Sequence, residues 1–227
     1  MLISLVAIII IAAMVFKRLP NVVSEPDVFS TAAKPAQPSP SPAPARPSRP
    51  PDDFLTAVEH YNAKKLNEAE EVLLKLTLEK PDFRAYSLLG TVYLEKDQAV
   101  KAVDPLSSSL KLKPSASVYS NLGLAYYKLA NYPDAIDAYK KAIQLDSKNL
   151  HRFYNLAICY QKEKDYPNAI IVLQQALRNQ PNNPVTLRYL AVVSQANGDI
   201  LQARKFYERI LEVDPGNSDA KKELSRL

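Results

Sequence analysis

The side chains that could carry out catalysis are few in this sequence, and they form no catalytic pattern. Neither of the two histidines, His60 and His151, has a cysteine or carboxylate at the spacing of metal ligands. The sequence contains no glycine-rich phosphate loop, no Gly-x-Ser-x-Gly turn around a nucleophile and no His-Glu-x-x-His pair. We therefore expect a protein that is not an enzyme, with no catalytic residue, no cofactor and no metal site.

The single cysteine, Cys159, excludes a disulfide within the chain and a zinc site built from several cysteines. It lies between Leu156 and Tyr160 on the apolar face of an expected helix. We interpret Cys159 as a small core residue and not as a reactive thiol.

The elements that must position any functional residue recur with a fixed period. In residues 116–149, apolar residues recur at three- and four-residue steps, which predicts two amphipathic helices. Pro133 stands where the first turn of the second helix needs no N–H group. Ala135 of this segment has counterparts at spacings of 33, 33, 34 and 34 residues along the chain: Ala69, Ala102, Ala169 and Ala203. A large apolar residue follows each alanine four positions later: Leu73, Leu106, Tyr139, Leu173 and Tyr207.

The first helix of each repeat carries a second set of markers. A leucine followed by glycine or alanine recurs in register at Leu89, Leu122, Leu156 and Leu190. This period and these residues resemble the tetratricopeptide repeat, a helix–turn–helix unit. The resemblance implies an all-α fold, a right-handed α-solenoid of five repeats over residues 52–217. Because Ala220, Leu224 and Leu227 share one helical face, we expect a capping helix over residues 218–227.

The resemblance also implies a binding surface, because the family generally binds peptides or proteins in a concave groove lined by the first helices. Transferred position by position, that groove would include eight polar or aromatic residues. They are Arg84, Asn121, Tyr127, Lys128, Tyr154, Asn155, Lys162 and Arg188.

Asn121 and Asn155 are the most informative pair, because they occupy equivalent positions 34 residues apart. A primary amide offers both a donor and an acceptor to an extended peptide backbone. Asparagine ladders of this kind are used in the family. Leu88 and Tyr189 hold the neighbouring positions, so the ladder has two steps only, and a purely local structural role for both asparagines stays open.

Residues 2–16 carry no charge and no proline, and Lys17 and Arg18 end the apolar run. A cleaved signal peptide has its positive charges before the apolar run, so we expect residues 1–19 to form a transmembrane anchor. At ~1.5 Å per residue the run spans only about 23 Å of a ~30 Å hydrocarbon core, unless Lys17 and Arg18 extend toward the membrane surface. The basic pair favours repeats that face the cytoplasm, with the periplasmic or extracellular side as the alternative.

Residues 20–51 include ten prolines, which predicts a disordered, extended linker. Its simplest role is a spacer that holds the repeats away from the bilayer. A docking peptide for a proline-binding module, over residues 47–50, is the alternative.

The net charge of +5 does not indicate nucleic-acid binding. From Asp52 onward, 24 lysines and arginines nearly balance 22 aspartates and glutamates, and they form no basic stripe. The sequence therefore predicts a membrane-anchored, non-catalytic adaptor that binds a protein or peptide partner and no nucleic acid. Two alternatives stay open: a scaffold that self-assembles as a homo-oligomer, and an exported soluble repeat protein after signal cleavage.

Overall fold

The computed structural model describes residues 53–227, so the predicted anchor (residues 1–19) and linker (residues 20–51) lie outside the described residues. Residues 53–129 form one compact unit, the N-terminal unit, and residues 130–227 form another, the C-terminal unit. Across residues 53–227 the chain forms eleven α-helices in tandem and no strand. The all-α solenoid of helix–turn–helix repeats that the sequence predicts is confirmed.

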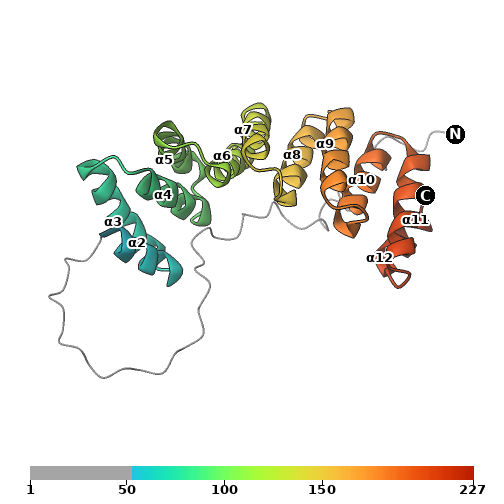
Figure 1. The fold of residues 1–227 in the computed structure, drawn as a ribbon, viewed down its shortest axis with the longest axis horizontal. Coiled ribbons are helices and arrows are strands. Elements are labelled where there is room, and N and C mark those ends of the chain that lie inside the picture. Colours follow the sequence, from blue (N-terminus) through green and yellow to red (C-terminus); the bar gives the residue numbers. More distant parts are fainter. Residues whose placement is uncertain (1–52) are drawn as a thin grey trace, which may run out of the picture. The chain divides into compact units, whose positions relative to one another are not determined.

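The N-terminal unit contains five helices that pack in chain order (Figure 1). They are α2 (Asp53–Asn62), α3 (Leu66–Glu79), α4 (Phe83–Glu95), α5 (Ala99–Leu112) and α6 (Ala116–Lys128). α2 packs on α3, α4 packs on α5, and α4 also contacts α2, α3 and α6. The first helices of successive repeats therefore lie side by side within this unit.

The C-terminal unit repeats the arrangement with six helices (Figure 1). They are α7 (Tyr132–Leu145), α8 (Leu150–Lys162), α9 (Tyr166–Asn179), α10 (Pro184–Ala196), α11 (Ile200–Val213) and α12 (Ser218–Leu224). α8 packs on α9, α10 packs on α11, and α10 also contacts α8 and α9. The short α12 packs on α11, where Ala220, Leu224 and Leu227 contact the apolar cluster around Tyr207 and Ile210.

The repeated alanines explain how closely the paired helices approach. Ala69 and Ala102 are fully buried, as are Leu73 and Leu106 one turn later on the same helices. At Gly90 of α4 the approach is closer still, because an added Cβ would lie 2.4 Å from Leu106 Cγ of α5. The leucine–glycine marker in this repeat is therefore a packing requirement.

The turns between paired helices use one backbone conformation throughout. A single residue with positive φ occupies the same repeat position in each of the five turns: Lys64, Asp97, Ala130, Lys164 and Gly198. Only Gly198 is a glycine, and its φ is +85°. After three of these turns a side chain caps the next helix by accepting a backbone N–H three residues on: Asn131, Asp165 and Asp199.

Two further observations concern the helices. Helix α5 continues from Ala99 to Leu112 with Pro105 inside it. Within residues 53–227, no helix combines the length and the apolar character needed to cross a bilayer.

Candidate functional site

In the N-terminal unit, the predicted groove residue Asn121 is held by a neighbouring first helix. Asn121 Nδ2 on α6 donates to Thr91 Oγ1 on α4 at 3.0 Å. Thr91 Oγ1 in turn donates to the carbonyl oxygen of Ser87 at 3.0 Å. This chain of bonds orients the amide and leaves its oxygen and one N–H for another partner.

The predicted cations of this unit already have acidic partners. Arg84 Nη2 lies 2.7 Å from Asp82 Oδ2, and Lys128 Nζ lies 2.6 Å from Asp97 Oδ1. The side-chain hydrogen bond from Arg84 lowers the pKa of Asp82, and the bond from Lys128 lowers the pKa of Asp97. Tyr127, which precedes Lys128 on α6, is half-buried. The positive charges of Arg84 and Lys128 are thus largely balanced by local carboxylates.

In the C-terminal unit, Tyr154 of α8 joins the next first helix, α10. Its hydroxyl lies 2.7 Å from Thr186 Oγ1, and its ring stacks on Tyr189 with centroids 4.7 Å apart. His151 packs edge-on against the same ring at 5.9 Å. Burial raises the pKa of Tyr154 and, more strongly, that of Tyr189, to about 12. Tyr154 therefore fixes the spacing of α8 and α10, which the sequence did not predict.

Asn155 follows Tyr154 and is only 6% exposed. Its amide makes no hydrogen bond within residues 53–227, in contrast to the amide of Asn121. Lys162, the last residue of α8, is exposed. The two asparagines that the sequence treats as equivalent thus differ in their bonding.

Arg188 of α10 lies in a cavity between α10, α11 and α12, beside Tyr207. Its Nε atom is buried and has no hydrogen-bond partner in the described residues. Of the eight predicted groove residues, the structure brings Tyr154 and Asn155 together on α8, whereas Arg188 faces the last two helices.

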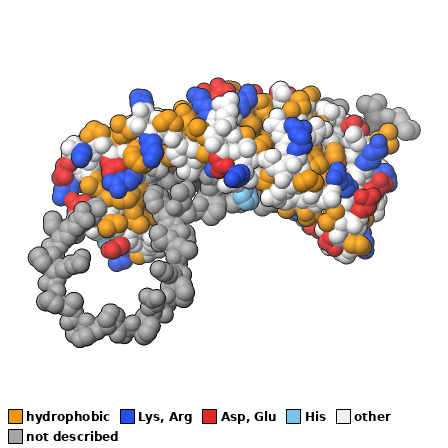
Figure 2. All heavy atoms as spheres, in the orientation of Figure 1, with side chains coloured by type: hydrophobic (Ala, Val, Ile, Leu, Met, Phe, Trp, Pro, Cys, Tyr) orange, Lys and Arg blue, Asp and Glu red, His pale blue; other side chains and the backbone are white. Residues whose placement is uncertain are grey.

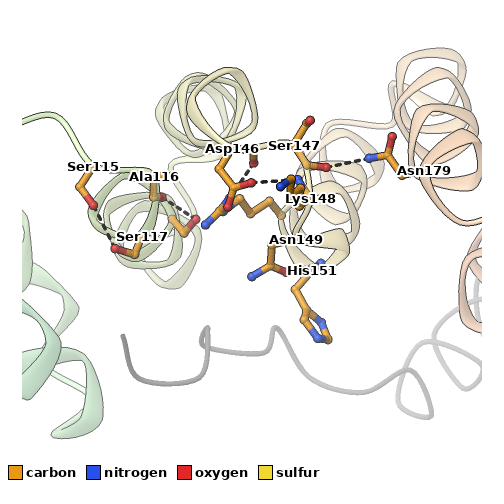
Figure 3. Close-up of polar contacts among 11 residues, drawn as sticks. Ser115, Ala116, Ser117, Asp146, Ser147, Lys148, Asn149, His151 and Asn179 are labelled. Atoms are coloured by element: carbon orange, nitrogen blue, oxygen red, sulfur yellow. Dashed lines mark hydrogen bonds and ion pairs between the residues drawn. The ribbon is translucent and has the colours of Figure 1, made fainter. Parts of the chain in front are cut away.

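Sequence reasoning missed Arg152, a buried cation of α8 that organises the loop before it. Its Nη1 atom donates at 2.6 Å both to the carbonyl oxygen and to Oδ2 of Asp146. Two hydrogen bonds lower the pKa of Asp146. The larger effect comes from the backbone N–H of Lys148 and the smaller one from Arg152. Figure 3 shows Asn179 Nδ2 of α9 donating to the Ser147 carbonyl oxygen, at 2.7 Å. The sequence offered one signal for this role, because Arg152 is a charged residue beside the apolar residue Phe153 near the start of the helix.

The described residues show little of the chemistry of catalysis. No group of three His, Cys, Asp or Glu side chains that could hold a metal ion occurs within residues 53–227. Cys159 is fully buried, and burial raises the pKa of its thiol to about 12. Its environment is that of a core residue, as predicted.

Comparison with known proteins agrees with this architecture. The sequence model of the tetratricopeptide repeat family matches residues 116–149, and a second model of the same family matches residues 152–183. A search of curated proteins finds no match to the chain. The tandem helix pairs define the class, a helical-repeat protein. The chain contains tetratricopeptide repeats over residues 116–149 and 152–183.

Solved structures with the same fold include those of MamA and YrrB. A crystal structure of MamA aligns with a TM-score of 0.67 at 20% identity, covering 70% of this chain and 88% of that chain. YrrB, described as a TPR protein with an unusual peptide-binding site, aligns with a TM-score of 0.67 at 17% identity, covering 77% of this chain and 91% of that chain. MamA from MSR-1 aligns with a TM-score of 0.61 at 20% identity over 72% of this chain and 95% of that chain. At these identities the similarity shows the fold.

Proposed function

We propose that the chain is a non-catalytic adaptor that binds an extended segment of a protein partner along its first helices. Membership of a repeat family that generally binds peptides or proteins supports this role. So does the description of YrrB, a protein of the same fold, as having a peptide-binding site. The proposal concerns the face of α8 and α10 in the C-terminal unit and, separately, the face of α4 and α6 in the N-terminal unit.

The observation that carries the proposal is the state of the Asn155 amide. Packing around Asn155 leaves the residue 6% exposed, so its side chain has already lost much of its rotational freedom. Its donor and acceptor are nevertheless unused within residues 53–227. Because the side chain is already held in place, a partner backbone that bonds to the amide loses less conformational entropy than it would by ordering a freely rotating side chain.

Asn121 supports the same role in a weaker form. The bond to Thr91 uses one of its two N–H groups at 3.0 Å and fixes the plane of the amide. An extended peptide could still donate to its oxygen and accept its second N–H. We therefore expect Asn121 to contribute less binding energy than Asn155.

We extend the proposal to the membrane on the basis of residues 1–19 alone. An apolar run followed by Lys17 and Arg18 would tether the adaptor, and the linker over residues 20–51 would separate the repeats from the bilayer. In this arrangement the repeats face the cytoplasm. Alkaline extraction of membranes, followed by protease protection of the repeats, tests the tether and its orientation separately.

Affinity purification from native cells tests the groove assignment. The full chain with a C-terminal tag is compared with the double variant Asn121→Ala and Asn155→Ala, and the captured proteins are quantified by mass spectrometry. We expect specific partners to fall about tenfold or more, because each lost backbone-type hydrogen bond costs roughly 1 kcal/mol and the effects of two add. A matched control replaces two exposed amides of second helices, Gln144→Ala and Gln175→Ala. Equal recovery from all three proteins would reject the groove.

Self-assembly is a second candidate function, favoured by one observation. Leu78 of α3 is 86% exposed and Leu55 of α2 is 57% exposed, so the first repeat presents apolar side chains outward. Exposed apolar residues of this kind can pair with another copy of the chain. Light scattering of the full chain in detergent distinguishes the two functions. A single protomer at high concentration rejects the scaffold, whereas concentration-dependent assembly that Leu78→Glu abolishes favours it.

A further inference from the structure

The helices of the two units differ in how their N-termini are capped. In the C-terminal unit, the side chain before each of the six helices accepts a backbone N–H of the first turn: Asn131, Asn149, Asp165, Asn183, Asp199 and Asn217. In the N-terminal unit, Asp82 caps α4 in the same way. Lys65, Gln98 and Ser115, which precede α3, α5 and α6, make no such bond. The first turns of these three helices therefore lack a side-chain acceptor.

The side chains, and not the backbone, cause two of these missing caps. Lys65 has φ −84° and ψ 70°, close to the −85° and 67° of Asp165, which does cap its helix. Gln98 lies nearby at −104° and 57°, but its Oε1 atom is buried without a hydrogen-bond partner in the described residues. Ser115 has a suitable hydroxyl, which instead pairs with Ser117 Oγ at 3.0 Å. Each absent cap makes opening of its helix about fivefold more favourable.

The second helices of the N-terminal unit have two further weaknesses. Pro105 lies in the interior of α5, where it cannot donate the main-chain hydrogen bond of that turn. Helix α3 buries two side chains, Ala69 and Leu73, whereas α9 buries four. Leu74 and Leu78 of α3 are 40% and 86% exposed, and Figure 2 shows apolar side chains at the surface of the N-terminal helices. Less apolar burial and a lost hydrogen bond both favour local opening of these helices.

We infer that the N-terminal unit opens while the C-terminal unit stays folded, which is a conformational device built into one end of the chain. Each repeat of such an array contacts only its neighbours, so one part can unfold before the rest. Helix α4 packs on α3 and α5, and their opening removes its support. The hydrogen bond between Asn121 of α6 and Thr91 of α4 is then lost.

The consequence for binding rests on the proposed function. Opening of the N-terminal unit removes the face of α4 and α6 and leaves the face of α8 and α10 in place. The two faces therefore differ in availability, because the first exists only while α3 and α5 are closed. A partner that binds the closed face holds it closed, since it binds the folded state alone.

Hydrogen exchange of the full chain in detergent, measured by mass spectrometry, tests the order of opening. We expect the backbone amides of α3 and α5 to exchange about tenfold or more faster than those of α9 and α11, because two absent caps each contribute about fivefold. Helix α11 is the control for fraying at the end of an array, since it belongs to the last repeat. Equal exchange of α3 and α11 would overturn the inference.

Restoring the caps tests the cause. We expect the double variant Lys65→Asp and Gln98→Asp to slow exchange of α3 and α5 about tenfold or more and to leave α9 unchanged. The matched control, Asp165→Gln, removes the cap of α9 and should speed its exchange about fivefold without affecting α3 and α5. An unchanged rate for α3 and α5 in the double variant contradicts the inference. Equal slowing of α9 contradicts it too, because the two units would then open together.

These measurements contain no partner, so their outcome does not depend on the groove. Failure of the groove assignment appears in the affinity purification of the double asparagine variant. Failure of the conformational device appears in the exchange rates of the unbound chain.

Discussion

Replacing Tyr154 with phenylalanine tests whether its contact with α10 holds the candidate site together. Tyr154 Oη and Thr186 Oγ1 lie 2.7 Å apart, and the two residues are 5% and 0% exposed. Phenylalanine keeps the stacking on Tyr189 but removes one hydroxyl and leaves the other buried without its partner. Leaving such a group unpaired costs about 1–3 kcal/mol. A loss of about 2 kcal/mol lowers the unfolding temperature of a protein of this size by roughly 4–8 °C.

The assay is a double-mutant cycle measured by thermal and urea unfolding. Thr186→Val alone should also destabilise, whereas Tyr154→Phe combined with Thr186→Val leaves neither hydroxyl unpaired. We therefore expect the double variant to lose less than the sum of the single losses, with a coupling of about 1 kcal/mol or more. Tyr166→Phe, half-buried on α9, is the control and should change stability by less than about 0.5 kcal/mol. Additive single effects, or a Tyr154→Phe loss within that control range, would refute the reasoning.

Three further predictions concern other parts of the structure. Cys159 should resist iodoacetamide in the native chain and react after unfolding in urea, as followed by mass spectrometry. Because the pKa of its thiol rises from 9.0 to about 12 on folding, the stability that Cys159 contributes should decline as the pH increases above about 9. Gly198→Ala should lower the free energy of unfolding by about 1 kcal/mol, because φ is +85° although the added Cβ meets no atom within 4 Å. Ala130→Gly in the equivalent turn should not destabilise the protein, and urea unfolding of both variants tests this pair. Arg152→Met should cost roughly 1–3 kcal/mol in the same assay, because it removes two hydrogen bonds of 2.6 Å to Asp146 from a residue that is 4% exposed.

The period of the sequence was sufficient to predict the elements and their buried faces. Ala69 and Ala102, chosen by spacing alone, are fully buried, and α7 begins at Tyr132, beside the proline expected in its first turn. These features depend on local rules, such as helical periodicity and the missing N–H of proline, which repeat with the sequence. The positive φ of Ala130 and its counterparts was not predicted, because Lys64, Ala130 and Lys164 are not glycine and carry no turn signal.

The polar contacts of the candidate site could be predicted only in part. Spacing places Asn121 and Asn155 at equivalent positions, yet the first bonds to Thr91 and the second has no partner in the described residues. The difference arises from the neighbouring helix, which supplies Thr91 to Asn121 but provides no such partner for Asn155. Arg188 shows the same limit, since its surroundings depend on the distance between α10 and the capping helix, and a repeat period carries no information about that distance.

Site-directed photocrosslinking in native cells tests the central claim, that the first-helix face around Asn155 binds a protein segment. A photoreactive amino acid is placed at Gln161, half-buried on α8, and in a separate protein at Gln175, exposed on the second helix α9. The adaptor function predicts a discrete crosslinked partner from Gln161, reduced about tenfold by Asn155→Ala, and none from Gln175. The same crosslinks from both positions, or a Gln161 crosslink that Asn155→Ala leaves unchanged, would contradict it.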